Sequence, residues 1–99
     1  MTATMITIGT LNPQGDVHLQ RYAEMVIPLL ESAGVTIRGR FKGIESLVGE
    51  VHPDLVAVME FPDVAAMKQF LSSSSYQKAL PHRNNAFKTI HTFACESLM

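Results

Sequence analysis

A basic stripe is the first feature of this sequence that could carry chemistry. Arg38, Arg40 and Lys42 alternate with other residues within 35–48, a segment predicted to be a strand. Side chains two apart on a strand share one face, so the three charges are expected on one side of a sheet. Such a stripe is most often a solvated face. Alternatively, Arg40 lies in an interior, where its planar guanidinium can hold a carboxylate through two hydrogen bonds.

Glu60 is the acid that could pair with this stripe. It is the one charged residue of the apolar segment 55–61, and it shares a strand face with Val56 and Val58. Strands joined by a hairpin are neighbours, and two opposite charges can be buried together where either alone would be destabilising. We therefore expect an Arg40–Glu60 pair in the interior. It is either a structural ion pair or part of a ligand site for a small acidic or carbonyl compound.

The C-terminal third holds the other candidate residues. His82 adjoins Arg83 close to Tyr76, and a neutral imidazole is the side chain best suited to act as a general base near pH 7. Tyr76 and Arg83 are candidates for ligand contact, or else they hold the segment before the last strand in place. His91 and Cys95 lie four apart on one strand face, which is a weak pattern for a metal site. We expect no metal, haem or other cofactor.

Composition narrows the class of protein. The chain has 99 residues, 46% of them hydrophobic, with eight Lys and Arg against nine Asp and Glu. This length predicts one domain, residues 1–99, and the charge balance gives no basic surface for nucleic acid or an anionic membrane. The longest apolar run, 55–59, is far too short to span a membrane, and one cysteine cannot form an internal disulfide. We expect a cytoplasmic protein.

The elements that must position these residues follow from their periodicity. Alternation and β-branched content predict strands over 3–11, 35–48, 55–61 and 87–95. Helical spacing predicts helices over 17–33 and 64–71, then, after a loop at 72–75, a pair of short helical turns over 76–86 broken at Pro81. The order βαββαβ is that of a ferredoxin-like α+β fold, with an antiparallel four-stranded sheet.

Local signals set the expected ends of the two longer helices. Asp16 is expected to be the N-cap of the first helix, Pro28 to kink it and Gly34 to end it. The second helix is expected to begin after a cap at Asp63.

The apolar pattern also predicts a homodimer. Two helices can cover one face of the sheet, yet the strands over 3–11 and 55–61 are apolar on both sides. The second face would leave a larger apolar patch than monomers usually expose. Pairing two such sheets face to face would cover it.

In the fourth strand we expect Phe87, His91 and Phe93 on one face and Ile90 on the other.

Several short motifs coincide with those of one known family. They are the Glu60-Phe61-Pro62 strand end, Phe70, Tyr76-Gln77 after a run of serines, Arg83 seven residues beyond the tyrosine, and Tyr22 and Pro28 in the first helix. Together they resemble the domain of unknown function 1330 family, in the dimeric α+β barrel superfamily, over residues 3–96. The resemblance implies a ferredoxin-like subunit whose sheet closes a barrel with that of a partner, and Arg40 looks like the arginine of the family's second strand.

Two classes of function follow from this resemblance. The first is a small-molecule-binding barrel, with cofactor-independent enzymes such as monooxygenases and isomerases among its superfamily relatives. The second is a non-catalytic dimer that senses a ligand or docks to another protein. A cavity with polar groups directed into it would favour the first class, and a solidly packed interior the second.

Overall fold

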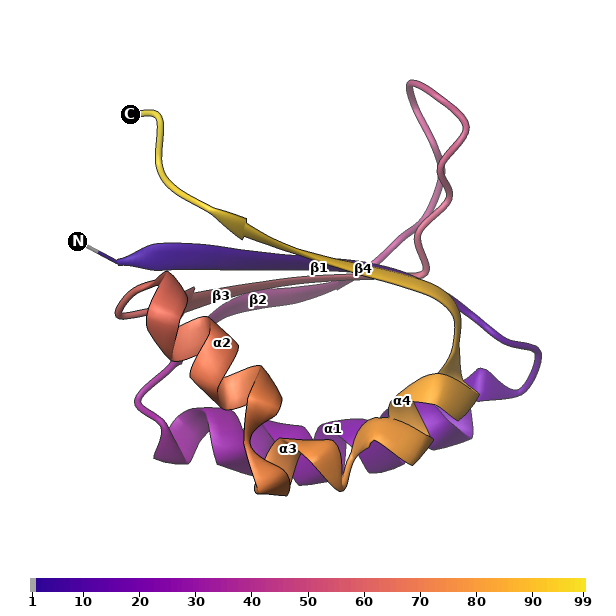
Figure 1. The fold of residues 1–99 in the computed structure, drawn as a ribbon. Coiled ribbons are helices and arrows are strands. Elements are labelled where there is room, and N and C mark those ends of the chain that lie inside the picture. Colours follow the sequence, from indigo (N-terminus) through magenta and orange to yellow (C-terminus); the bar gives the residue numbers. More distant parts are fainter. Residues whose placement is uncertain (1) are drawn as a thin grey trace.

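A four-stranded antiparallel sheet with helices on one face forms the structure, a computed structural model that describes residues 2–99 (Figure 1). The strands are β1 (Ala3–Leu11), β2 (Thr36–Lys42), β3 (Leu55–Phe61) and β4 (Phe87–Cys95), in the order β2-β3-β1-β4. The helices are α1 (Gly15–Ser32), α2 (Val64–Ser72), α3 (Ser74–Gln77) and α4 (Leu80–Ala86). This is the predicted ferredoxin-like arrangement, with β1 at the centre between β3 and β4.

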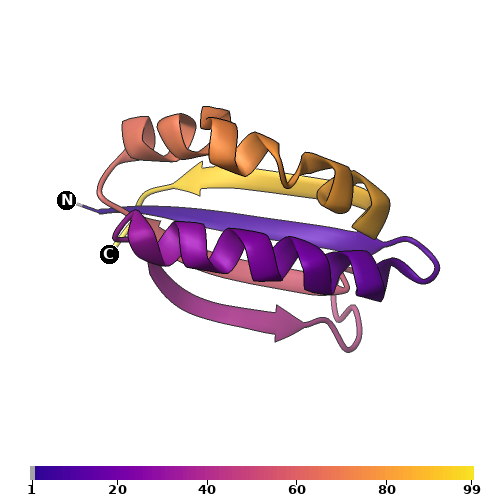
Figure 2. The same ribbon diagram turned by 90° about the horizontal axis from the view of Figure 1, so that it is seen from below.

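The helices form two parallel rows under the sheet. α1 runs across the middle, and α2, α3 and α4 follow one another along the β4 side, while β2 extends beyond α1 as an uncovered edge (Figure 2). Val26 and Leu30 of α1 are buried, and they share a core with Met5, Phe61 and other side chains of the sheet. α1 continues through Pro28 to Ser32. The helix face of the sheet is therefore the one that α1 and the second row enclose.

Helix boundaries differ from the sequence prediction at Asp16, where the structure shows no N-cap. The N-cap position is Gln14, with φ 61°, and Asp16 lies in the first turn without a capping hydrogen bond. A carboxylate there still interacts favourably with the unpaired amides of the first turn. Gly34 does end the helix region as predicted, with φ 74°, in the left-handed region that glycine adopts without strain.

The serine-rich segment is helical rather than a loop. Ser72 ends α2, Ser73 accepts a hydrogen bond from the amide of Tyr76 at 3.2 Å, and α3 begins one residue later. The break between the two short helices falls before Leu80. Pro81 lies in the first turn of α4, where a missing amide hydrogen removes no hydrogen bond.

A β-bulge in β2 changes which residues share a face. Ile37 pairs with Met59 and Gly39 with Val58, so Arg38 is an extra residue that has no partner on β3. One extra residue moves every later side chain to the opposite face. β2 is also shorter than predicted, because it ends at Lys42 and residues 43–54 form a loop.

A second irregularity places Phe87 on the helix face, not with His91 and Phe93 as predicted. The β1–β4 register shifts between Thr10 and Leu11, so that Leu11 pairs with Phe87. Phe87 is buried, whereas His91 and Phe93 are exposed on the other face.

That other face, called here the open face, carries no helix. Its central positions are Ile6, Ile8, Val56, Val58 and Phe93. The loop 43–54 rises on this side at one end of the sheet, and the C-terminal segment rises on the same side at the other end (Figure 1). Phe41 and Phe93 of this face are 56% and 48% exposed. Within residues 2–99, no helix is long and apolar enough to cross a membrane.

The N-cap of α2 provides a test of the local structure. The Asp63 carboxylate accepts a hydrogen bond from the amide of Ala66 at 2.7 Å, as the sequence predicted. Asp63→Ala should lower the free energy of unfolding by about 1 kcal/mol, because an amide of the first turn loses its partner. Asp63→Asn keeps an acceptor and is the matched control. Chemical denaturation measures both, and an unchanged midpoint for Asp63→Ala would contradict this role.

Candidate ligand-binding site

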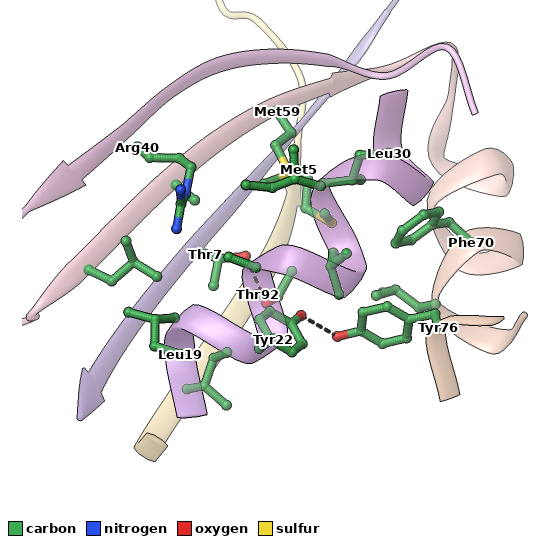
Figure 3. Close-up of a pocket in the computed structure, with 17 residues that line it drawn as sticks. Met5, Thr7, Leu19, Tyr22, Leu30, Arg40, Met59, Phe70, Tyr76 and Thr92 are labelled. Carbon is green, nitrogen blue, oxygen red and sulfur yellow. Dashed lines mark hydrogen bonds between the residues drawn. The ribbon is translucent and has the colours of Figure 1, made fainter. Parts of the chain in front are cut away.

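A cavity of about 60 Å³ lies between α1 and the helix face of the sheet (Figure 3). Its walls are mainly apolar side chains, among them Leu19, Val26, Ile27, Met59, Phe70 and Ile90. The polar side chains that line it are Thr7, Tyr22, Arg40, Tyr76 and Thr92. An apolar pocket with a few converging polar groups is the usual form of a small-molecule site.

Arg40 lies at the side of this cavity that opens past α1. Because of the bulge at Arg38, Arg40 pairs with Ala57 and its side chain lies on the helix face, directed toward α1 (Figure 3). Arg40 also lines an open groove on the outer side of α1, together with Asp16 and Glu24. Among residues 2–99 its guanidinium makes no ion pair and no side-chain hydrogen bond. Its five N–H donors are therefore free for a ligand.

The expected Arg40–Glu60 pair is wrong, because the bulge puts these two residues on opposite faces of the sheet. Glu60 lies on the open face, as its alternation with Val56 and Val58 predicted, and it pairs there with Arg38. Arg38 Nε donates to Glu60 Oε2 at 2.8 Å, and Nη2 lies 2.5 Å from the same oxygen. Glu60 consequently does not reach the cavity.

A chain of three hydrogen-bonding groups closes the inner end of the cavity. Arg83 Nη1 donates to the Tyr76 hydroxyl at 3.1 Å, and the hydroxyls of Tyr76 and Tyr22 lie 2.8 Å apart. The two tyrosine rings meet edge to face, with centroids 6.2 Å apart. Phe70 packs against the Tyr76 ring at a centroid distance of 5.4 Å. The structure thus brings together Tyr76 and Arg83, both predicted from sequence, and adds Tyr22.

Burial keeps the Tyr22 hydroxyl protonated. Desolvation raises the pKa of Tyr22 well above its usual range, and the neighbouring Tyr76 raises it further, while the Arg83 guanidinium lowers it. Tyr22 is thus a neutral hydrogen-bond donor at all physiological pH values. It adds no negative charge to a cavity that holds a free arginine.

Thr7 and Thr92 add a second polar pair on the floor of the cavity. Their hydroxyl oxygens lie 3.0 Å apart across β1 and β4. Sequence reasoning missed these residues and the role of Tyr22. Alternation placed Thr7 on the face of Met5, and Tyr22 was the one residue with a polar group in the apolar stripe of α1. A hydroxyl at such positions is the signal that could have indicated a polar end to a buried space.

The histidines do not come to the cavity. His82 is half-buried in α4 but does not line the cavity, so the structure does not unite it with Tyr22 or Arg40. His91 and Cys95 pair with Ile8 and Thr4 on the open face. In the part of the chain from residue 2 onward, no three His, Cys, Asp or Glu side chains form a group that could hold a metal ion.

Comparison with known proteins supports the fold. A family model described as domain of unknown function 1330 matches residues 5–95, and no curated protein matches the chain. A protein of unknown function from Rhodopseudomonas palustris superimposes with a TM-score of 0.87 at 21% identity, over 99% of this chain and 83% of the other.

Two further solved structures are similar at lower identity. A dimeric protein of unknown function with a ferredoxin-like fold from Bacteroides fragilis has a TM-score of 0.69 at 15% identity, over 97% of this chain and 96% of the other. A hydroxynitrile lyase from Passiflora edulis has a TM-score of 0.75 at 12% identity, over 99% and 95%. At these identities the likeness shows the fold alone.

The tyrosine pair predicts a loss of stability in alkali. A raised folded-state pKa means that the neutral Tyr22 stabilises the fold fully below the unfolded pKa of about 10, and that this contribution is lost as pH rises above it. Above about pH 10 the free energy of unfolding of the natural chain should fall by up to about 1.4 kcal/mol per pH unit more than that of Tyr22→Phe.

Denaturation at several alkaline pH values measures this difference. The chain has two tyrosines and no tryptophan, so tyrosinate absorbance follows Tyr22 and Tyr76 alone. If the free energy of unfolding depends on pH in the same way in the natural chain and in Tyr22→Phe, then folding does not raise the pKa of Tyr22.

Proposed function

Because the chain belongs to the domain of unknown function 1330 family, whose description assigns no activity, we propose a function from the site itself. The domain binds a small acidic or carbonyl compound in the cavity between α1 and the sheet. Arg40 holds its acidic group, and Tyr22, Tyr76 and Arg83 form the polar end of the site. The observation that carries the proposal is the Arg40 guanidinium beside an apolar cavity, with no side-chain partner among residues 2–99.

The charges around the cavity support an anionic ligand. The described residues that line it include Arg40 but no Asp, Glu, His or Cys. Arg83, which is half-buried behind Tyr76, adds a second positive charge close to the inner end. Bringing a carboxylate into this space would offset positive charge that the protein leaves uncompensated, whereas a cation would be repelled.

The same lining bears on whether the domain is an enzyme. A hydroxynitrile lyase shares the fold, and an enzymatic reaction without a cofactor in the cavity of this chain is one form of this proposal. Acid–base catalysis needs a base within hydrogen-bond reach of the ligand, and none of the described lining residues is one at neutral pH. This favours the alternative of a non-catalytic domain that senses its ligand.

The proposal includes a homodimer formed through the open face. A neighbour with this fold is dimeric, and the open face exposes Phe41 and Phe93 beside the apolar side chains of β1 and β3. A second sheet would cover these side chains and leave the Arg38–Glu60 pair between the subunits. The cavity lies on the other side of the sheet, so each subunit would keep its own site.

Arg40 and Arg38 form a matched pair for testing the ligand site. Short monocarboxylates, from acetate to pentanoate, are titrated against the protein while amide signals near the cavity are followed by NMR. Arg40→Met should weaken binding about 10-fold or more, because a charge-assisted hydrogen bond to the ligand is lost. Arg38→Met removes the same charge from the open face and should change affinity less than about 2-fold. Equal effects of the two changes, or none, would refute the site.

The dimer is tested separately by light scattering coupled to size exclusion. At micromolar concentration the mass should be about twice the 10.9 kDa of the chain. Phe93→Lys, on the open face, should give monomers, because it would bury an unpaired charge. Gln69→Lys, on an exposed position of α2, is the control and should stay dimeric. A monomeric natural chain would contradict this assembly.

A further inference from the structure

We propose that Tyr22 is a ligand-contacting donor that selects short oxo acids, compounds that carry a carbonyl oxygen at some distance from a carboxylate. Tyr76 and Arg83 are positioning residues that direct the Tyr22 hydroxyl hydrogen into the cavity. This inference rests on the proposed function, since it assigns the far end of the ligand that Arg40 holds.

The direction of the hydrogen bonds follows from counting donors and acceptors. The Tyr76 hydroxyl has two partners among residues 2–99, Arg83 Nη1 at 3.1 Å and the Tyr22 hydroxyl at 2.8 Å. Arginine can only donate, so the Tyr76 oxygen accepts from Arg83. The Tyr22 oxygen is the only acceptor that the described residues offer to the hydrogen of Tyr76, which favours donation from Tyr76 to Tyr22. Tyr76 is 4% exposed, so water offers no alternative, and a buried donor without a partner is destabilising.

This direction of donation, from Arg83 to Tyr76 and from Tyr76 to Tyr22, leaves the hydroxyl hydrogen of Tyr22 without an acceptor among the described side chains. When Tyr76 donates to the Tyr22 oxygen, the hydrogen of Tyr22 points away from Tyr76, and Tyr22 has no other side-chain partner in the described part of the chain. Tyr22 lines the cavity, and its hydroxyl lies at the end where Tyr76 stands (Figure 3). Successive hydrogen bonds polarise one another, so donation from Arg83 through Tyr76 makes Tyr22 a stronger donor.

The chemical class of ligand follows from the two ends of the cavity. Arg40 at the mouth suits a carboxylate, and an inner hydroxyl hydrogen without an acceptor suits a carbonyl oxygen. The apolar side chains between them suit a short aliphatic link. A simple carboxylic acid would leave the Tyr22 hydrogen unpaired in a desolvated space, so the site should reject it relative to an oxo acid.

Matched ligands test this selectivity. The probes are 2-oxobutanoate and 3-oxobutanoate against butanoate, and 4-oxopentanoate against pentanoate, each titrated by calorimetry into the natural chain, Tyr22→Phe, Tyr76→Phe and Arg40→Met. In the natural chain at least one oxo acid should bind about 10-fold more tightly than its simple acid. Tyr22→Phe should bring that ratio to about one, because it removes the hydroxyl hydrogen that an oxo acid would accept and a simple acid would leave unpaired.

Tyr76→Phe tests whether Tyr76 orients the Tyr22 hydroxyl or only supports the fold. It leaves the Tyr22 hydroxyl in place but removes the group that orients it, so the ratio of the two affinities should fall to a value between those of the natural chain and Tyr22→Phe. If a tyrosine variant does not fold, a ligand labelled with ¹³C at the ketone gives a second measurement on the natural chain. A hydrogen bond from Tyr22 should move the bound carbonyl signal downfield.

The outcomes separate this inference from the proposed function. Equal affinity for oxo and simple acids, with both dependent on Arg40, would overturn the role of Tyr22 and leave the anion site intact. Failure of every acid to bind, or binding that Arg40→Met does not weaken, would overturn both. A bound ketone signal at its free-solution position would also exclude the hydrogen bond from Tyr22.

Discussion

The extra residue that β2 inserts opposite β3 divides the charges of this domain between the two faces of its sheet. Before the bulge β2 follows the alternation of β3, and after it the faces are exchanged. Arg38 therefore meets Glu60 on the open face, while Arg40, two residues later, lies beside the cavity. If β2 paired with β3 in regular register without the bulge, Arg38 and Arg40 would both share a face with Glu60, and the cavity lining would have no cation. The candidate site thus depends on a backbone irregularity as much as on any side chain.

The helix face and the open face can consequently serve separate purposes. On the helix face, α1 leaves a space above the central strands, and aromatic contacts among Phe70, Tyr76 and Tyr22 hold the inner end of that space in shape. The open face is broad and apolar, with one ion pair near its edge. In the proposed assembly, association uses one face and ligand binding the other, so that neither function competes with the other for surface.

Sequence periodicity predicted the four strands, the two longer helices and their order, because apolar residues recur at the strand or helix period in most of these segments. It failed where one residue breaks the alternation. A glycine within a strand, such as Gly39, does not by itself show whether the strand inserts an extra residue there, so Arg40 was expected on the same face as Arg38 and Glu60. The cavity depended on contacts between distant segments, such as Tyr22 with Tyr76, that no local pattern reports. Tyr76 and Arg83 were predicted because their spacing resembles that of a family. Such a resemblance indicates which residues matter, but it does not show which side chains they contact.

The central position of β1 has a consequence for how the chain is made. Thr7 of β1 and Thr92 of β4 are neighbours although 85 residues separate them, and β1 also pairs with β3. A ribosome adds roughly 5–20 residues per second, so roughly 4 to 17 seconds pass between the synthesis of β1 and the synthesis of β4, its last partner strand. During that interval a strand with apolar residues on both faces has one open edge, available to any other nascent chain. Formation of the sheet therefore depends on this edge staying unpaired with other chains until β4 has been made.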